Sequence, residues 1–145
     1  MSTEHNKQIV LRWRKERNNG NWNIIDELHA PDYVGYITGV PGPVHGREAL
    51  KQLFAGYWAA FDVHATPAPD LLIAEGDWVV NRETTRVKHI GAFQGIPPTG
   101  KEASVTSTDI YRIVDGTIVE QWTEADMFGL LQQLGVLSTP ERGTP

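Results

Sequence analysis

Apolar residues recur at helical spacing through the first part of the chain. Residues 4–18 are predicted to form a helix that ends at Gly20, and one of its faces carries Ile9, Val10, Trp13 and Arg17. A second short helix, with Ile24, Ile25 and Leu28 on one side, is predicted to end before Pro31. A third helix is predicted over residues 47–61, with an apolar face made of Leu50, Leu53, Phe54, Tyr57, Trp58 and Phe61.

After Asp62 the apolar pattern changes from helical spacing to alternation. Strands are predicted over residues 71–74, 78–89, 103–114 and 117–125, in addition to a short one over 32–36. The last two strands are joined by Asp115-Gly116, the pair that a type I′ turn prefers, and therefore form a β-hairpin. A final helix is predicted over residues 127–134, ended by Gly135.

Helices followed by a run of antiparallel strands indicate an α+β fold. We expect a curved antiparallel sheet that packs on three N-terminal helices, encloses a pocket and is followed by a short C-terminal helix. A length of 145 residues fits one domain. We assign residues 1–137 to this domain and residues 138–145 to a flexible tail.

The hairpin also predicts which side chains share a face. If Asp115 and Gly116 are the central residues of the turn, Val114 lies opposite Thr117 and Asp109 lies opposite Trp122. Alternation then places on one face Val105, Ser107, Asp109, Tyr111, Ile113, Ile118, Glu120, Trp122, Glu124 and Asp126. Acids and large aromatics on one face indicate a partly apolar pocket with a polar end. A one-residue slip or a bulge would change this assignment.

Composition excludes several classes of site. The chain has no cysteine, so disulfides and thiolate chemistry are excluded, and a cytoplasmic location is expected. The N-terminus has no apolar signal segment, and no apolar run is long enough to span a membrane. A net charge of −5, with both signs mixed, argues against nucleic-acid binding. The five histidines have no tight metal-ligand spacing, so no metal is expected.

Motifs along most of the chain carry a family resemblance. They are His45–Leu50, His89–Gly91, Gly95–Gly100, Tyr111–Ile113, Asp115–Val119, Trp122, Asp126 and Gly129–Gly135. With these motifs the chain resembles the SnoaL-like polyketide (ester) cyclases, within the superfamily of cone-shaped α+β folds typified by nuclear transport factor 2. The resemblance is strongest over residues 89–135. It is specific for the family and weak for the substrate, because this fold hosts many activities.

The resemblance implies a cofactor-free intramolecular aldol condensation that closes the last ring of an aromatic polyketide methyl ester. One aspartate of the family acts as acid and base, and Asp126 occupies the matching position. Family members often carry a histidine on the preceding strand, where the nearest inward candidate here is Asp109, while His89 lies one strand earlier. The candidate catalytic residues are therefore Asp126, Asp109 and His89. Asp126 also directly precedes a predicted helix, so an N-cap is the alternative role.

The expected ligand is a small hydrophobic or aromatic molecule. The candidate substrate-binding residues are Trp122, Glu124, Tyr111, Tyr33, Tyr36, Trp58, Phe54 and His45. Trp122 is placed to stack on a flat ring, and Tyr33 and Tyr36 to gate the mouth of the pocket. The acids have an alternative interpretation as a solvated rim that pairs with Arg82, Arg86 or Lys88.

Two other functions stay open at this level. In an epoxide hydrolase or dehydratase of the same fold, Asp109 and Asp126 would activate water together with Arg82 or Arg86. In a non-catalytic module the pocket would only bind a ligand. The resemblance further implies a homo-oligomer, a dimer or tetramer that packs through the open face of the sheet.

Overall fold

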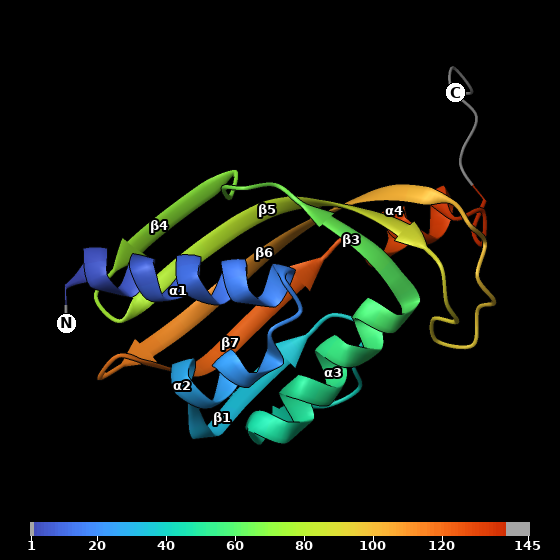
Figure 1. Cartoon of the computed structure of the whole chain (residues 1–145). Helices are drawn as coiled ribbons and strands as arrows, with labels where there is room; N and C mark the ends of the chain where they lie inside the picture. Colours follow the sequence, from blue (N-terminus) through green and yellow to red (C-terminus); the bar gives the residue numbers. More distant parts are fainter. Residues whose placement is uncertain (1, 139–145) are drawn as a thin grey trace.

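The computed structural model describes residues 2–138, and these form a mixed α+β fold (Figure 1). The N-terminal helices are α1 (Thr3–Asn18), η1 (Trp22–Ile24), α2 (Ile25–Leu28) and α3 (Gly46–Ala60), and α4 (Met127–Gln133) follows the sheet. The expected α+β class, the N-terminal helical layer and the C-terminal helix are confirmed. The predicted tail over 138–145 lies outside the described residues apart from Ser138.

The sheet is long and curved, and the helices α1, α2 and α3 lie on one side of it (Figure 1). Its strands are β1 (His29–Ile37), β2 (Val44–His45), β3 (Phe61–Ala65), β4 (Leu71–Glu75), β5 (Trp78–His89), β6 (Glu102–Val114) and β7 (Thr117–Ala125). The order is β2-β1-β7-β6-β5-β3, and β4 also pairs with β5. The sheet is not antiparallel throughout, because β1 runs parallel to β7.

The core has two parts. The larger part joins the N-terminal helices to the sheet around Trp13, Tyr33 and Leu50, each of them fully buried. The smaller part lies around Phe61 and Phe93 and includes Leu130 of α4. The sequence pattern assigned Phe61 to the third helix, but the helix ends at Ala60 and Phe61 begins β3. Phe61 therefore enters the sheet, where it lies opposite His89.

A β-bulge in the β6–β7 hairpin decides which side chains face inward. The turn forms as predicted, with positive φ at Asp115 (49°) and Gly116 (80°), and Val114 pairs with Thr117. The register then shifts between Arg112 and Ile113. Beyond this bulge, the residues that face Asp109, Tyr111 and Ser107 are Thr123, Gln121 and Ala125. The predicted pairing of Asp109 with Trp122 is wrong, because one extra residue in β7 moves every later side chain to the other face.

Candidate functional site

A cavity lies between the concave face of the sheet, the end of α1, α3 and the start of α4. Its volume is about 170 Å³, on the order of ten times the space that one water molecule needs. Much of its wall is aromatic or aliphatic, including Phe54, Tyr57, Trp58, Phe61, Phe93 and Leu130. Phe54 and Trp58, both predicted to bind substrate, therefore lie where the sequence placed them. Such a wall suits a flat apolar ligand.

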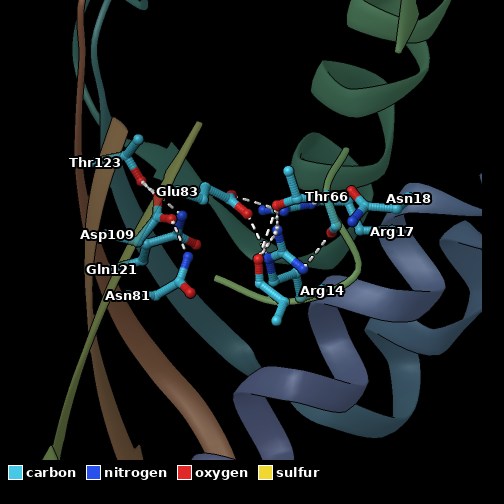
Figure 2. A network of polar contacts seen from close by, with 10 residues as sticks. Arg14, Arg17, Asn18, Thr66, Asn81, Glu83, Asp109, Gln121 and Thr123 are labelled. Atoms are coloured by element: carbon cyan, nitrogen blue, oxygen red, sulfur yellow. Dashed lines mark hydrogen bonds and ion pairs between the residues drawn. The ribbon is translucent and has the colours of Figure 1, made fainter. Parts of the chain in front are cut away.

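The carboxyl group of Asp109 lies at the polar end of this cavity. Asp109 is 3% exposed and projects from β6 toward the helices. Asn81 donates to its Oδ2 at 3.1 Å, and the Thr123 hydroxyl donates to its Oδ1 at 2.6 Å (Figure 2). Burial raises the pKa of Asp109 above its usual value, although the Arg17 charge and these two hydrogen bonds act in the opposite direction. A raised pKa brings a carboxylate closer to the basicity that a general base needs.

A chain of hydrogen bonds fixes the surroundings of Asp109. The Tyr33 hydroxyl donates to Oε1 of Gln121 at 2.8 Å, and Nε2 of Gln121 donates to the Thr123 hydroxyl at 2.8 Å. Burial raises the pKa of Tyr33, so its hydroxyl keeps its proton and acts as a donor. Gly35 is needed beside it, since a Cβ there would overlap the Tyr33 hydroxyl. Tyr33 is fully buried and holds Gln121 in place, and it is not among the residues that line the cavity.

Glu83 binds two arginines of α1 and forms a buried ion triad with them (Figure 2). Its Oε2 accepts from Nε of Arg14 at 2.5 Å, and its Oε1 accepts from Nη2 of Arg17 at 2.7 Å. All three side chains are less than a tenth exposed. Burial opposes ionisation of Glu83, but the charges of Arg17 and Arg14 outweigh it and hold its pKa below the usual value. Arg17 and Glu83 both line the cavity, so the triad places charge beside Asp109.

Asp126 lies outside the cavity. It is exposed, and its Oδ1 accepts a hydrogen bond from the backbone N–H of Gly129 at 2.9 Å, which makes it the N-cap of α4. Gly129 permits this cap, because a Cβ there would overlap the Asp126 carboxylate. The predicted pocket-side position of Asp126 is therefore wrong, and the alternative of an N-cap is confirmed.

The two candidate histidines do not reach the cavity wall either. His89 is fully buried at the end of β5, where its Nδ1 accepts from the backbone N–H of Thr99 at 3.1 Å and its ring packs on Phe61. His45 is exposed just before α3. Within residues 2–138, no three His, Cys, Asp or Glu side chains gather as they would around a metal ion.

Comparisons with known proteins show the family to which the chain belongs. The family model described as SnoaL-like polyketide cyclase matches residues 7–134. The chain belongs to this family. It is 32% identical to the nogalonic acid methyl ester cyclase of Streptomyces nogalater over 118 residues, which cover 81% of this chain and 88% of the relative. It is 28% identical to the aklanonic acid methyl ester cyclase DnrD of Streptomyces peucetius over 140 residues, covering 94% and 96% of the two chains.

Solved structures support the same assignment to the SnoaL-like fold. TsrD from Streptomyces laurentii superposes with a TM-score of 0.82 at 29% identity, covering 94% of this chain and 99% of TsrD. IdmH from Streptomyces antibioticus superposes with a TM-score of 0.78 at 31% identity, covering 90% and 99%. The curved sheet and its helical layer are thus shared with other members of the fold.

This SnoaL-like chain carries an aromatic patch on the convex face of its sheet. We call Tyr36, Trp78, Ile110 and Trp122 the outer patch. The Tyr36 and Trp122 rings stack 5.8 Å apart, and the Trp78 ring lies 5.7 Å from Trp122. The predicted pocket positions of Trp122, Glu124 and Tyr36 are therefore wrong. The bulge turns Trp122 and Glu124 outward. Tyr36 of β1 lies opposite Trp122, and 45% of the Tyr36 surface is exposed.

Sequence reasoning identified part of the lining of the cavity and missed the charged residues Arg17 and Glu83. Tyr111 faces inward as predicted but is 1% exposed and lies behind the cavity wall. The arginines proposed for a hydrolytic site lie elsewhere, because Arg82 bonds Thr108 and Arg86 lies near Glu102 on the exposed face of β5. Arg17 reaches the cavity instead. The sequence feature that pointed to Arg17 was its position on the apolar face of the first helix, where a charged side chain needs a buried partner.

No described helix is long and apolar enough to cross a membrane.

Proposed function

We propose that this chain is a cofactor-free cyclase that closes a ring of an aromatic polyketide ester by intramolecular aldol condensation, with Asp109 as the acid and base. The observation that carries the proposal is a nearly buried carboxylate at the polar end of a cavity with aromatic walls. The substrate class follows the two relatives named as methyl ester cyclases. Asp126 is not part of this proposal, since its carboxylate caps α4.

One carboxyl group is sufficient for the proton transfers. Asp109 takes a proton from the carbon beside a substrate carbonyl, and an enolate forms. The enolate carbon attacks a second carbonyl carbon of the same molecule, so a C–C bond forms and the carbonyl oxygen becomes an alkoxide. Asp109 returns its proton to this oxygen, and the carboxylate is restored. No electron or group is gained or lost, so the reaction needs no cofactor.

The walls of the cavity supply the rest of the catalysis in this proposal. A flexible ester with two reacting carbons gains from being folded so that these atoms approach to about 3–3.5 Å. Phe54 and Trp58 would pack on the aromatic part of the substrate and hold it there. Exclusion of water would also strengthen the electrostatic effect of the charged groups around Asp109.

The test is the turnover of aklanonic acid methyl ester by two matched variants. Asp109→Asn removes the base but keeps the size of the side chain, and we expect a loss of about 10²–10⁴-fold in kcat. Asp126→Asn is the control, because asparagine caps a helix as well as aspartate does, and it should retain wild-type turnover. Loss of turnover in Asp126→Asn with retention in Asp109→Asn would contradict the proposal. Entry of oxygen from labelled water into the product would indicate hydrolytic chemistry. Absence of turnover by the wild type would indicate a binding module.

We also propose that the chain forms a homodimer through the outer patch. Tyr36, Trp78 and Ile110 are 45%, 43% and 37% exposed, and they are contiguous with Trp122 on one sheet face. A contiguous aromatic patch of this kind is uncommon on a monomer and typical of an interface between proteins.

A further inference from the structure

The two arginines that bind Glu83 are not equivalent. Arg14 uses all three guanidinium nitrogens within the protein, since it bonds Glu83, the Thr66 carbonyl and hydroxyl, and the Ala68 carbonyl. Arg17 uses Nη2 for Glu83 and has a long 3.4 Å contact from Nε to Asn18. Its Nη1 donates no hydrogen bond within residues 2–138, and Arg17 lines the cavity while Arg14 does not. Arg17 thus lines the cavity and keeps a donor, Nη1, that the described residues do not use.

The buried charges also leave one positive charge to be balanced. Arg14 and Arg17 face a single carboxylate in Glu83, so the triad carries a net charge of +1 when ionised. An ionised Asp109 carboxylate partly balances this excess, and the Arg17 charge lowers the pKa of Asp109, although burial of the carboxylate outweighs this effect. When Asp109 accepts a proton, its negative charge disappears while the triad stays positive. A buried excess charge is costly unless another group neutralises it.

We propose that Nη1 of Arg17 binds the substrate oxygen that becomes negatively charged when Asp109 removes the proton. This inference rests on the proposed function and adds a second catalytic residue to it. The negative charge moves from the Asp109 carboxylate to the enolate oxygen, and the same guanidinium stabilises it in both places. The oxygen that becomes an alkoxide during ring closure is stabilised in the same way before Asp109 returns the proton. A donor held in place before the reaction needs no rearrangement as charge develops.

Glu83 and Trp13 hold the guanidinium for this role. The Glu83 carboxylate fixes Nη2 at 2.7 Å, and the Trp13 ring lies 5.9 Å from the centre of the guanidinium group. A purely structural ion triad makes a different prediction, because the pKa of a bound phenol would then not depend on Arg17 in particular. Comparison of the two arginines therefore separates a catalytic role from a structural one.

The test uses a planar phenol in place of the substrate enolate. Alizarin, a hydroxyanthraquinone, changes its visible spectrum on ionisation, so its pKa can be measured by absorbance with and without protein. Binding to the wild type should lower the phenol pKa by about 1–3 units, the usual effect of an opposite charge at close range. We expect Arg17→Gln to abolish this shift and Arg14→Gln to retain it, although each variant removes one positive charge that pairs with Glu83. Arg17→Lys should restore part of the shift, and thermal unfolding checks that each variant is folded.

The outcomes separate this inference from the proposed function. Equal shifts in Arg17→Gln and the wild type, or equal losses in the two glutamine variants, would overturn the role of Arg17. So would a failure of the wild type to bind or ionise the dye. If Asp109→Asn still abolishes turnover in that case, the proposed function stands without Arg17. If Asp109→Asn retains turnover while the dye shift depends on Arg17, the anion site is real and the proposed base is wrong.

Discussion

The Thr123 hydroxyl donates a 2.6 Å hydrogen bond to Oδ1 of Asp109. Thr123 already accepts from Nε2 of Gln121, whose Oε1 accepts from the Tyr33 hydroxyl. An ionised carboxylate can only accept, so the Thr123 proton points at Asp109 while Asp109 is charged. A bond to the ionised form stabilises that form, so Thr123 partly offsets the effect of burial on Asp109.

Thr123→Val should move the pH profile of the reaction. Valine keeps the shape of threonine but removes the donor, so the ionised form of Asp109 loses a bond and its pKa rises further. We expect the low-pH limb of kcat/KM to move to higher pH by about one unit, the equivalent of one hydrogen bond to a charged group.

Thr85→Val is the matched control for this shift. Thr85 lines the same cavity from β5, and its hydroxyl makes no hydrogen bond within the described residues. Its replacement should leave the low-pH limb in place. Equal shifts in both variants would mean that cavity polarity, and not the bond to Asp109, controls ionisation.

Asp109→Asn should stabilise the folded protein at neutral pH. The pKa of Asp109 is higher in the folded protein than in the unfolded chain. Between these two pKa values the folded protein binds more protons than the unfolded chain, so the free energy of unfolding falls as pH rises through this range. Asparagine removes this loss, which amounts to about 1.4 kcal/mol for each unit of elevation.

Urea unfolding at several pH values measures this difference. The gap between Asp109→Asn and the wild type should be largest above the folded-state pKa of Asp109 and should close toward acidic pH, where both side chains are neutral. A gap that is constant across pH would show that packing, and not ionisation, sets the stability of this position.

Glu83→Gln should strongly destabilise the fold. The substitution leaves Arg14 and Arg17 buried without their carboxylate, and loss of one partner of a buried ion pair typically costs about 3–5 kcal/mol. The free energy of unfolding in urea measures the cost.

Glu27→Gln is the control, because Glu27 also binds an arginine of α1 through both oxygens, yet it pairs with Arg12 at the surface. The Glu27 and Arg12 side chains are 57% and 51% exposed, so we expect a loss below about 1 kcal/mol. Similar costs for Glu83→Gln and Glu27→Gln would mean that the triad contributes little beyond an exposed pair.

Local patterns predicted the elements well and the long-range relationships less well. The helical spacing of the first helix and the hairpin turn at Asp115-Gly116 depend on neighbouring residues, and both are present. The parallel pairing of β1 with β7 joins segments far apart in the chain, where no local pattern acts. The bulge opposite Arg112 and Ile113 likewise has no local signal that we can identify.

The bulge explains why two of the predicted pocket residues face outward. Asp109 precedes it on β6 and keeps its inward position, whereas Trp122 and Glu124 follow it on β7 and turn outward. The Arg14–Glu83 contact joins residues 69 positions apart and could not be read from spacing. Arg17 was visible as a charge on an apolar helix face, but its partner was not.

Trp122→Lys should separate the proposed dimer into monomers. A lysine in the centre of the outer patch places a charge where two aromatic faces would meet, and desolvation of that charge opposes association. Sedimentation at several protein concentrations should show a monomer for this variant and a dimer for the wild type. Turnover should persist, because Trp122 lies on the face opposite the cavity.

Lys88→Glu controls for any change of charge on this face. Lys88 is exposed on the same side of β5 as Trp78, about 30 Å further along the strand. The Lys88→Glu variant should remain dimeric, since Lys88 lies outside the outer patch. A dimeric Trp122→Lys variant would place the interface elsewhere. A monomeric variant that also loses turnover while its fold is intact would indicate that the cavity depends on the second copy.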